Sequence, residues 1–344
     1  MSQPLIQSTL AKEDVPFENT LRPRELGGFI GQDAVRERLQ ILLDAARMRQ
    51  EALCHCLFCG PPGLGKTTLA HIMARGMGTQ LVVTSGPVVE KAGDLAGLLT
   101  QLKPGDVLFI DEIHRMNRVV EEYLYSAMED FVLDLMIDSG PSARSVQVRL
   151  HPFTLIGATT RAGLLSSPLR SRFGFTTRLD YYAAHDLETI VTRSSGLLDV
   201  NLEGDAAMRI AQRARGTPRI ANNLTRWVRD FATSRGVERV HGDVVERALA
   251  LLAIDEYGLE EMDRKILQVL VEYYQGGPVG LKTLAVAVGE EAEALEEVYE
   301  PFLVLQGYIK RTARGRMATP RAYALFGQSE PSGGCDEGIR AEVL

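Results

Sequence analysis

The chain has 344 residues, of which 45% are hydrophobic and 24% are charged, and its formal net charge is −7. This length and composition predict a globular protein with two or three domains. No stretch approaches the roughly 18 apolar residues of a membrane helix, and Met1–Thr20 lacks the basic start and apolar run of a signal peptide, so we expect a soluble, cytoplasmic protein without a membrane partner.

Short apolar runs alternate with helical patterns from Leu53 to Tyr182. The runs read LCHCLFC, QLVVTS, DVLFID, FTLIGATT and TRLDYY. One of the helical patterns has the i, i+3, i+4, i+7 spacing of an amphipathic helix, at Val120, Tyr123, Leu124 and Ala127. This alternation predicts an α/β domain built on a mainly parallel sheet.

The first predicted strand, Leu53–Gly60, is rich in cysteine. Cys54, Cys56 and Cys59 lie beside His55, a combination that can form a metal site. Successive side chains of a strand point to opposite faces, however, so Cys54 and Cys56 would point away from the other two. Small buried hydrophobic side chains are the better interpretation of these cysteines.

A phosphate-binding loop follows this strand directly. Residues 60–67 read GPPGLGKT, which fits the pattern GxxxxGK[ST] between a strand and a helical run. Backbone N–H groups and the helix N-terminus bind the phosphates in such a loop, while Lys66 meets the β- and γ-phosphates and Thr67 can hold Mg²⁺. The motif predicts ATP and Mg²⁺ as cofactors, with nucleotide-binding residues Gly63, Gly65, Lys66, Thr67 and Thr68.

Two later strands end in polar residues, where ligands of parallel sheets bind. The run VLFI is followed by Asp111 and Glu112, and the run FTLIGA by Thr159 and Thr160. We predict that Asp111 binds Mg²⁺ and that Glu112 polarises the attacking water. Of the two threonines, we expect Thr159 to contact the γ-phosphate.

Arginines are candidates for stabilising the transition state, in the manner of an arginine finger supplied by a neighbouring subunit. Arg170 and Arg172 lie in SPLRSRF, and Arg219 lies in RGTPRIANNL. Spacing alone does not choose among them, because most arginines are solvated surface groups.

After Tyr182 the pattern becomes helical to about Ile254, which predicts a small helical domain. A third unit begins near Gly258, and its pattern predicts a winged helix-turn-helix: the helical runs Met262–Tyr274, Leu281–Val288 and Ala292–Gln306, then two short strands within Gly307–Pro320. We therefore divide the chain into residues 1–182, 183–256 and 257–327, followed by a tail, 328–344, that we expect to be disordered.

The third unit carries a basic segment on an acidic chain. No acid lies between Pro301 and Ser329, whereas five cations occur there: Lys310, Arg311, Arg314, Arg316 and Arg321. A net negative charge argues mildly against a protein whose whole surface binds nucleic acid, but a local basic patch is typical of a contact with phosphates. The alternative is a solvated basic turn.

From Leu21 to about Phe326 the chain resembles the RuvB family of AAA+ ATPases, the ring-forming helicases of Holliday junction branch migration. The segments that carry the resemblance are GPPGLGKTTLA, TSGP, EKAGDLA, DVLFIDEIHR, FTLIGATTRAG, SPLRSRFG, RARGTPRIAN, MDRK, GGPVGL and RTARGRMAT. The resemblance implies an AAA+ large domain, a helical lid and a winged-helix head, arranged as a homo-hexameric ring.

The resemblance also implies roles for particular residues. Leu21 and Arg22 would line the adenine end of the site and Tyr182 would lie at the domain hinge. Arg172 would act as the finger in trans and Arg219 as a second sensor on the lid. A further family segment placed near the nucleotide comprises Glu129, Asp130 and Phe131.

The same resemblance implies macromolecular partners. Residues 131–150 look like the family's inserted hairpin, with a turn at Gly140-Pro141, whose outer residues Leu135 and Ile137 would contact RuvA; a hairpin packed on its own domain is the alternative. RuvC is a further partner of the complex. Around the wing, Arg311, Arg314 and Arg316 would contact the DNA backbone of the junction arms, although Ala292 stands where the family often has a basic residue.

Two other functions are alternatives to a DNA motor. A protein-remodelling unfoldase predicts an aromatic pore loop, but Gly86–Asp94 contains no aromatic residue. A clamp-loader-like or regulatory ATP-binding scaffold is disfavoured by the presence of Glu112 and Arg172.

Overall fold

Five of the apolar runs pair as one sheet. The computed structural model describes residues 20–136 and 145–329. Within them the sheet has the order β2-β3-β6-β1-β7, and every neighbouring pair is parallel. The strands are β1 (Cys56–Cys59), β2 (Leu81–Ser85), β3 (Val107–Asp111), β6 (Thr154–Thr159) and β7 (Phe175–Arg178). The α/β class expected from the sequence is confirmed.

Two strands lie elsewhere than the sequence predicts. β1 starts at Cys56 rather than Leu53, and β7 precedes most of the run TRLDYY. The register pairs Cys56 with Phe175 and Cys59 with Arg178, and the pairing of β7 with β1 ends there. Leu179 and Tyr182 extend the apolar run beyond the strand, since their side chains are buried in the irregular connection that leads to the lid.

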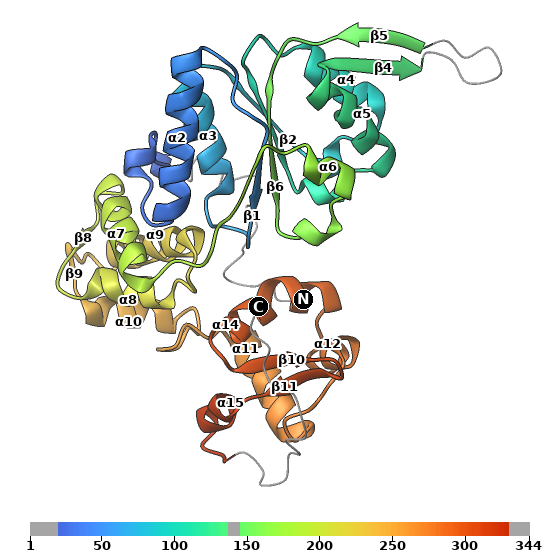
Figure 1. Cartoon of the computed structure of the whole chain (residues 1–344). Coiled ribbons are helices and arrows are strands. Elements are labelled where there is room, and N and C mark those ends of the chain that lie inside the picture. The colour runs from blue at the N-terminus through green and yellow to red at the C-terminus, as the bar shows by residue number, and fades with distance from the viewer. Residues whose placement is uncertain (1–19, 137–144, 330–344) are drawn as a thin grey trace. The chain divides into compact units, whose positions relative to one another are not determined.

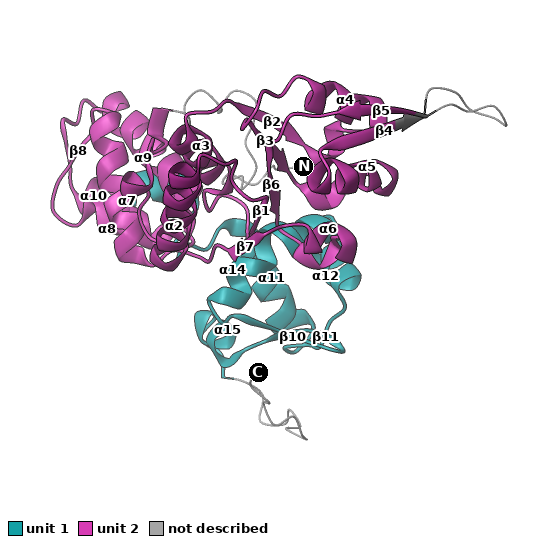
Figure 2. Cartoon of the chain, turned by 45° about the horizontal axis from the view of Figure 1, so that its top comes forward, with its two compact units in different colours: residues 1–5, 246–344 teal, residues 6–245 magenta. Residues whose placement is uncertain are grey.

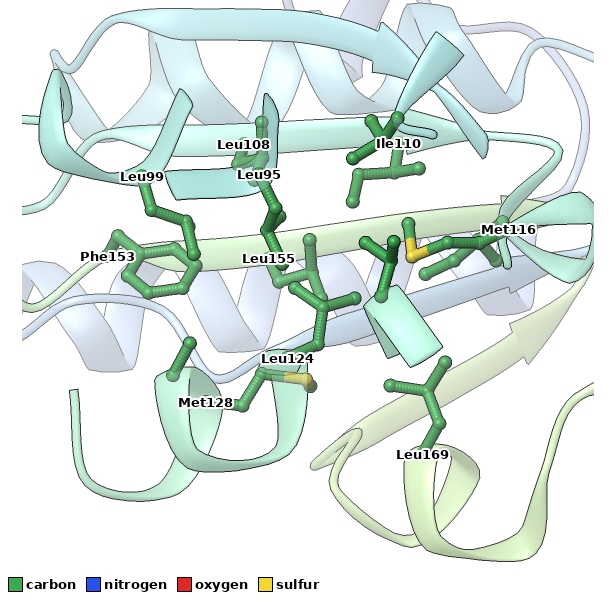
Figure 3. Close-up of a cluster of buried hydrophobic side chains, with 14 of the residues drawn as sticks. Leu95, Leu99, Leu108, Ile110, Met116, Leu124, Met128, Phe153, Leu155 and Leu169 are labelled. Carbon is green, nitrogen blue, oxygen red and sulfur yellow. The ribbon is translucent and has the colours of Figure 1, made fainter. Parts of the chain in front are cut away.

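Helices cover both faces of the sheet (Figure 1). On one side lie α2 (Asp33–Arg49) and α3 (Lys66–Met77), and on the other α4 (Ala92–Thr100), α5 (Arg118–Glu129) and α6 (Ser167–Ser171). Figure 3 shows how the second layer packs: strand side chains meet those of α4, α5 and α6, among them Leu95, Leu99, Leu108, Ile110, Leu124, Leu155 and Leu169. These side chains are almost fully buried and fix the strand ends that carry the polar residues.

An antiparallel pair follows α5, as the resemblance predicts. β4 (Val132–Met136) pairs with β5 (Ser145–Arg149), from Val132 opposite Arg149 to Met136 opposite Ser145. The predicted turn at Gly140-Pro141 and the predicted contact residue Ile137 lie outside the described residues.

The lid is mainly helical. It belongs to the same compact unit as the sheet domain, and that unit ends at Val245 (Figure 2). Its helices are α7 (Ala184–Leu197), α8 (Ala206–Arg213), α9 (Pro218–Ser234) and α10 (Gly242–Ala250), of which only the first four residues belong to this unit. The sequence shows only helical periodicity here, but β8 (Asn201–Leu202) also pairs in parallel with β9 (Arg239–Val240). Strands of two residues are too short to give a periodic pattern.

The second compact unit starts at Glu246 (Figure 2). Two of its helices continue as wider turns: α11 (Glu261–Gln268) through Val269–Tyr273, and α13 (Ala292–Ala294) through Leu295–Tyr299 into α14 (Glu300–Leu305). The other elements are α12 (Leu281–Val288), β10 (Ile309–Thr312), β11 (Gly315–Ala318) and α15 (Pro320–Leu325). β10 and β11 form an antiparallel hairpin, so helices followed by a wing are present as predicted. Across the described parts of both units, no helix is long and apolar enough to span a bilayer.

Candidate functional site

A cavity of about 340 Å³ lies at the carboxyl ends of the sheet strands, closed on one side by lid residues. The phosphate-binding loop follows β1, the two acids end β3, and α9 of the lid contributes Arg219. The cavity lining includes these residues predicted from the sequence: Leu21, Arg22, Gly63, Gly65, Lys66, Thr67, Thr68, Asp111, Glu112, Tyr182 and Arg219. Residues far apart in the chain thus meet at the sheet edge where ligands of parallel sheets bind.

The backbone of the loop requires glycine at two positions. Gly63 has φ +77° and Gly65 has φ +99°, conformations that side chains rarely adopt. A Cβ on Gly63 would lie 2.6 Å from Thr217 Cγ2, and one on Gly65 would lie 3.0 Å from the Phe29 ring. The loop therefore keeps its close turn only with glycine, directly before α3.

Lys66 is held inside this loop. Its Nζ donates hydrogen bonds to Gly60 O at 2.8 Å and Pro61 O at 2.7 Å, and the residue is 7% exposed. Burial lowers the pKa of the ammonium to about 8, although the nearby Asp111 carboxylate acts in the opposite direction. Such a cation gains strongly from an added phosphate charge.

The two acids differ in their surroundings. Asp111 Oδ1 accepts a hydrogen bond of 2.9 Å from the backbone N–H of Glu112, which fixes its carboxylate at the end of β3. Glu112 has φ +46°, and its Oε2 lies 3.0 Å from Arg115 Nη1. Asp111 and Thr67 thus present oxygen atoms of the kind that Mg²⁺ prefers, whereas the Glu112 carboxylate is 40% exposed and paired with an exposed arginine.

The structure gives the neighbouring Thr159 and Thr160 different surroundings, and the assignment of Thr159 to the γ-phosphate stays a prediction. Thr159 is 1% exposed, and its Oγ1 lies 3.0 Å from His114 Nδ1 and accepts a hydrogen bond of 3.0 Å from Arg161 N. Thr160 lines the cavity instead. Side chains of a strand alternate between faces, and the sequence does not reveal which of two neighbouring threonines faces the ligand.

Arg172 does not line the cavity of its own chain. Its Nη2 lies 3.0 Å from Glu129 Oε2, its Nη1 donates to Pro168 O at 2.7 Å, and its guanidinium carbon is 4.6 Å from the centroid of the Tyr125 ring. The side chain is 20% exposed. An ion pair, a backbone acceptor and a ring therefore hold the guanidinium in one place.

Glu129, Asp130 and Phe131 also do not line the cavity, and of the three Glu129 contacts Arg172. Phe131 packs its ring 5.9 Å from that of Phe153 and 6.4 Å from that of His55. Four residues predicted to lie near nucleotide are thus outside the cavity of their own chain. Contact with nucleotide would require a second copy.

A buried acid supports the helix that precedes Arg172. Glu121 is 6% exposed and accepts hydrogen bonds from Tyr125 Oη, at 3.0 Å, and from Ser166 Oγ. Ser166 is the N-cap of α6, with its Oγ accepting from Leu169 N at 3.2 Å. Glu121 thereby fixes both the start of α6 and the ring on which Arg172 rests.

Sequence reasoning missed several residues at the other end of the cavity: Phe29, Ile30, Ile190, Arg193 and Asn222. Arg193 Nη1 donates to Gly28 O at 2.9 Å, and its Nη2 donates to Leu21 O. Tyr182 Oη donates to Leu64 O at 3.2 Å. Arg193 lies within an ordinary amphipathic helix, so no local signal distinguishes it from a surface arginine.

The cysteine-rich run departs from its predicted burial. Cys56 and Cys59 are buried, but Cys54 is exposed because β1 begins only at Cys56. Both ring nitrogens of His55 are engaged: Nδ1 accepts from Leu155 N at 2.8 Å and Nε2 lies 3.0 Å from Met128 O. Because a backbone N–H is a donor, Nδ1 must accept and Nε2 carries the proton. Burial lowers the pKa of His55 and favours this neutral form.

In the C-terminal unit, two of the three predicted DNA-contacting arginines share one buried acid. Glu300 has a side-chain exposure of 1%; its Oε1 lies 2.6 Å from Arg311 Nε and 3.1 Å from Arg316 Nε, and its Oε2 lies 3.1 Å from Arg316 Nη2. Arg316 is 17% exposed, Arg311 is 50% exposed, and Arg314 is exposed at the turn of the wing. The positive charge of this wing is therefore concentrated near its tip.

A phosphate-binding loop, a strand ending in two acids and a lid arginine around one cavity, on a parallel sheet with a helical lid, define a P-loop ATPase of the AAA+ class. Family sequence models match three consecutive segments: "Holliday junction DNA helicase RuvB P-loop domain" at residues 21–179, "RuvB AAA lid domain" at 182–255 and "RuvB C-terminal winged helix domain" at 256–327. The chain belongs to the RuvB family.

Relatives and solved structures agree with this assignment. The Holliday junction branch migration complex subunit RuvB of Protochlamydia amoebophila is 60% identical over 331 residues, covering 96% of this chain and 100% of that protein. The protein of the same name from Chlamydia pneumoniae is 59% identical, with 92% and 94% covered. The solved Thermotoga maritima RuvB Holliday junction branch migration motor is 52% identical, with a TM-score of 0.82 and coverage of 91% and 100%. These findings do not favour the unfoldase or scaffold interpretations.

Proposed function

We propose that this chain is the ATP-driven motor that moves Holliday junctions during recombination and DNA repair. The observation that carries the proposal is the division of the catalytic groups. The phosphate-binding loop, the acids and the lid arginine share one cavity, whereas Arg172 is held rigidly outside it. Such a division suits an enzyme whose active site is completed by a neighbouring copy.

ATP would bind with its triphosphate on Gly63–Thr68 and its base between the Leu21–Arg22 segment and the lid. Thr67 and Asp111 would hold Mg²⁺ together with phosphate oxygens, and the ion would supply charge neutralisation at the β- and γ-phosphates. Glu112 would polarise the attacking water. Thr160 replaces Thr159 as the residue we assign to the γ-phosphate, because Thr160 lines the cavity.

Arg172 would reach the nucleotide of the adjacent subunit together with its partner Glu129, and Asp130 and Phe131 would belong to the same segment, as the resemblance implies. A head-to-tail contact that closes on itself gives a ring, and we propose six copies, as the family resemblance implies. Residues 1–182 would be the ATPase domain, 183–256 the lid and 257–327 the DNA-binding head. Hydrolysis would then rotate the lid against the ATPase domain.

The wing would contact the DNA backbone, chiefly through Arg314 and the exposed part of Arg311, while Arg316 shapes the hairpin. Contacts of this kind read phosphates rather than bases, which suits a protein that moves along DNA. The β4–β5 hairpin would bind RuvA, with RuvC joining the same complex. Such a machine would work in the cytoplasm.

The test is a junction-migration assay on a labelled four-way DNA, with this chain, ATP, Mg²⁺ and a RuvA partner. We expect ATP-dependent dissociation of the junction that requires both proteins, together with DNA-stimulated ATP hydrolysis. Hydrolysis stimulated by duplex DNA without junction movement would instead assign another DNA-dependent ATPase function.

A further inference from the structure

Cys54 packs against the segment that carries Arg172, and the thiol of Cys56 lies next to Cys54. Cys54 is exposed, just before β1, whereas Cys56 is fully buried. Cys56 Sγ donates a hydrogen bond of 3.2 Å to Cys54 O, so the second thiol reaches back to the first residue. A Cβ on Gly174 would lie 3.1 Å from Cys54 Cβ and 3.6 Å from its Sγ. Cys54 thus packs on the chain two residues beyond Arg172.

His55, between the two cysteines, contacts the residue that precedes Glu129, the ion-pair partner of Arg172. Its Nε2 donates to Met128 O at 3.0 Å, and Met128 directly precedes Glu129. Its Nδ1 accepts from Leu155 N at 2.8 Å, which anchors the ring to β6. A backbone change at His55 would therefore reach both members of the Arg172–Glu129 ion pair.

The two thiols differ in reactivity. A hydrogen bond from the Cys56 thiol lowers the pKa of Cys54 to about 7, against the effect of burial. The hydrogen bond to Cys54 and burial both raise the pKa of Cys56. The thiolate is the nucleophile in thiol–disulfide exchange, so the exposed Cys54 is suited to attack first.

We propose that Cys54 and Cys56 form an oxidisable pair, which a low-molecular-weight disulfide converts into an intramolecular disulfide that slows ATP hydrolysis. Cys54 Sγ attacks one sulfur of the reagent, whose S–S bond breaks to release one thiol. Cys56 Sγ then attacks Cys54 Sγ, and its proton passes to the second departing thiol. The protein loses two hydrogen atoms and the reagent gains them. The effect on hydrolysis rests on the proposed role of Arg172.

Closing this bond requires the backbone to move. Residues two apart in an extended segment are separated by about 6.6 Å of rise, whereas the Cβ atoms of a disulfide lie about 3.8 Å apart. The extended backbone at His55 must fold, and the ring then cannot keep both of its hydrogen bonds. A disulfide with such strain is also easily reduced, which makes the change reversible.

The test uses the full chain with Cys335→Ser, because Cys335 lies outside the described residues and would add an unrelated thiol. The protein is treated with oxidised glutathione, and its intact mass, ATP binding and DNA-stimulated hydrolysis are measured. We expect a mass loss of two hydrogen atoms and unchanged ATP binding. Turnover should fall about ten- to a hundredfold, since a misplacement of about 1 Å at a catalytic group costs up to ~10² in rate. Dithiothreitol should restore it.

Two variants separate the steps. Oxidised glutathione should change neither the mass nor the turnover of Cys54→Ser. The reaction of Cys56→Ala should stop at the glutathione adduct. The proposal is overturned if the parent protein also stops at the adduct, if Cys54→Ser is inhibited equally, or if the internal disulfide leaves turnover unchanged. A reduced protein without DNA-stimulated hydrolysis would refute the proposed function instead, while the mass measurement would still report on the thiol pair.

Discussion

Arg172 Nη2 lies 3.0 Å from Glu129 Oε2, and neither residue lines the cavity of its own chain. The ion pair, the Pro168 carbonyl and the Tyr125 ring together hold the guanidinium that we propose acts on the nucleotide of a neighbouring copy. A finger that is already ordered loses little side-chain entropy when the neighbouring nucleotide arrives.

We expect Arg172→Ala to abolish turnover and to spare nucleotide binding. Loss of an arginine finger costs about 10³- to 10⁵-fold in rate. Steady-state hydrolysis and equilibrium binding of a fluorescent ATP analogue would measure the two effects. Arg170→Ala is the matched control, since Arg170 is exposed on the same short helix and should remain near full activity. Equal loss in both variants would contradict a specific role for Arg172.

The support beneath Arg172 can be tested at Ser166. Ser166→Ala removes the N-cap of α6 and a donor to the buried Glu121, which should lower the unfolding free energy by about 1–2 kcal/mol. Turnover should fall more than nucleotide binding, because Arg172 lies at the end of that helix. Ser167→Ala is the control, because Ser167 is the exposed neighbour of Ser166. Chemical denaturation measures the unfolding free energy, and parallel ATPase assays measure turnover.

Thr160→Val and Thr159→Val should have different consequences. The first removes a hydroxyl that lines the cavity and is expected to reduce turnover with little change in stability. The second removes the hydroxyl that His114 Nδ1 and Arg161 N share. It should lower the free energy of unfolding by about 1–3 kcal/mol, and with it the melting temperature. If Thr159→Val alone reduced turnover at unchanged stability, the sequence-based assignment of Thr159 to the γ-phosphate would be supported and that of Thr160 refuted.

Nucleotide binding should take up protons near neutral to alkaline pH. Lys66 has a pKa of about 8 in the protein, so part of it is neutral above that pH, whereas a bound phosphate favours the ammonium. Affinity should therefore fall as pH rises from about 7 to 9, by at most about tenfold per unit. Calorimetry in buffers of different ionisation enthalpy would detect the uptake. Lys66→Arg should abolish it, since guanidinium stays protonated.

The wing arginines should separate into a DNA-binding and a structural class. Arg314→Ala should weaken DNA binding and reduce the slope of log K against log salt by about 0.9, with no change in melting. Arg316→Ala deprives the buried Glu300 of two hydrogen bonds and should destabilise the C-terminal unit by about 3 kcal/mol. Fluorescence anisotropy across a salt series and calorimetric melting distinguish them. Unchanged melting of Arg316→Ala would refute its structural role.

Local sequence determined the parts of this protein that depend on local backbone chemistry. The phosphate-binding loop needs glycine at Gly63 and Gly65 and a helix immediately after, and a buried strand must end where Asp111 begins the polar edge. Those constraints span a few residues, so three of the five sheet strands, the cavity's main residues and the helix-and-wing unit were predictable from pattern and family resemblance.

Only the tertiary structure decided which of two neighbouring residues lines the cavity and what each charge is paired with. Thr160 rather than Thr159 lines the cavity, Arg193 bonds the Leu21 carbonyl, and Glu300 neutralises part of the wing. Cys54 is exposed because the pairing of β1 begins at Cys56, three residues after the start of the apolar run. Each of these outcomes depends on contacts between segments far apart in the chain, and a linear pattern carries no information about the partner at the other end.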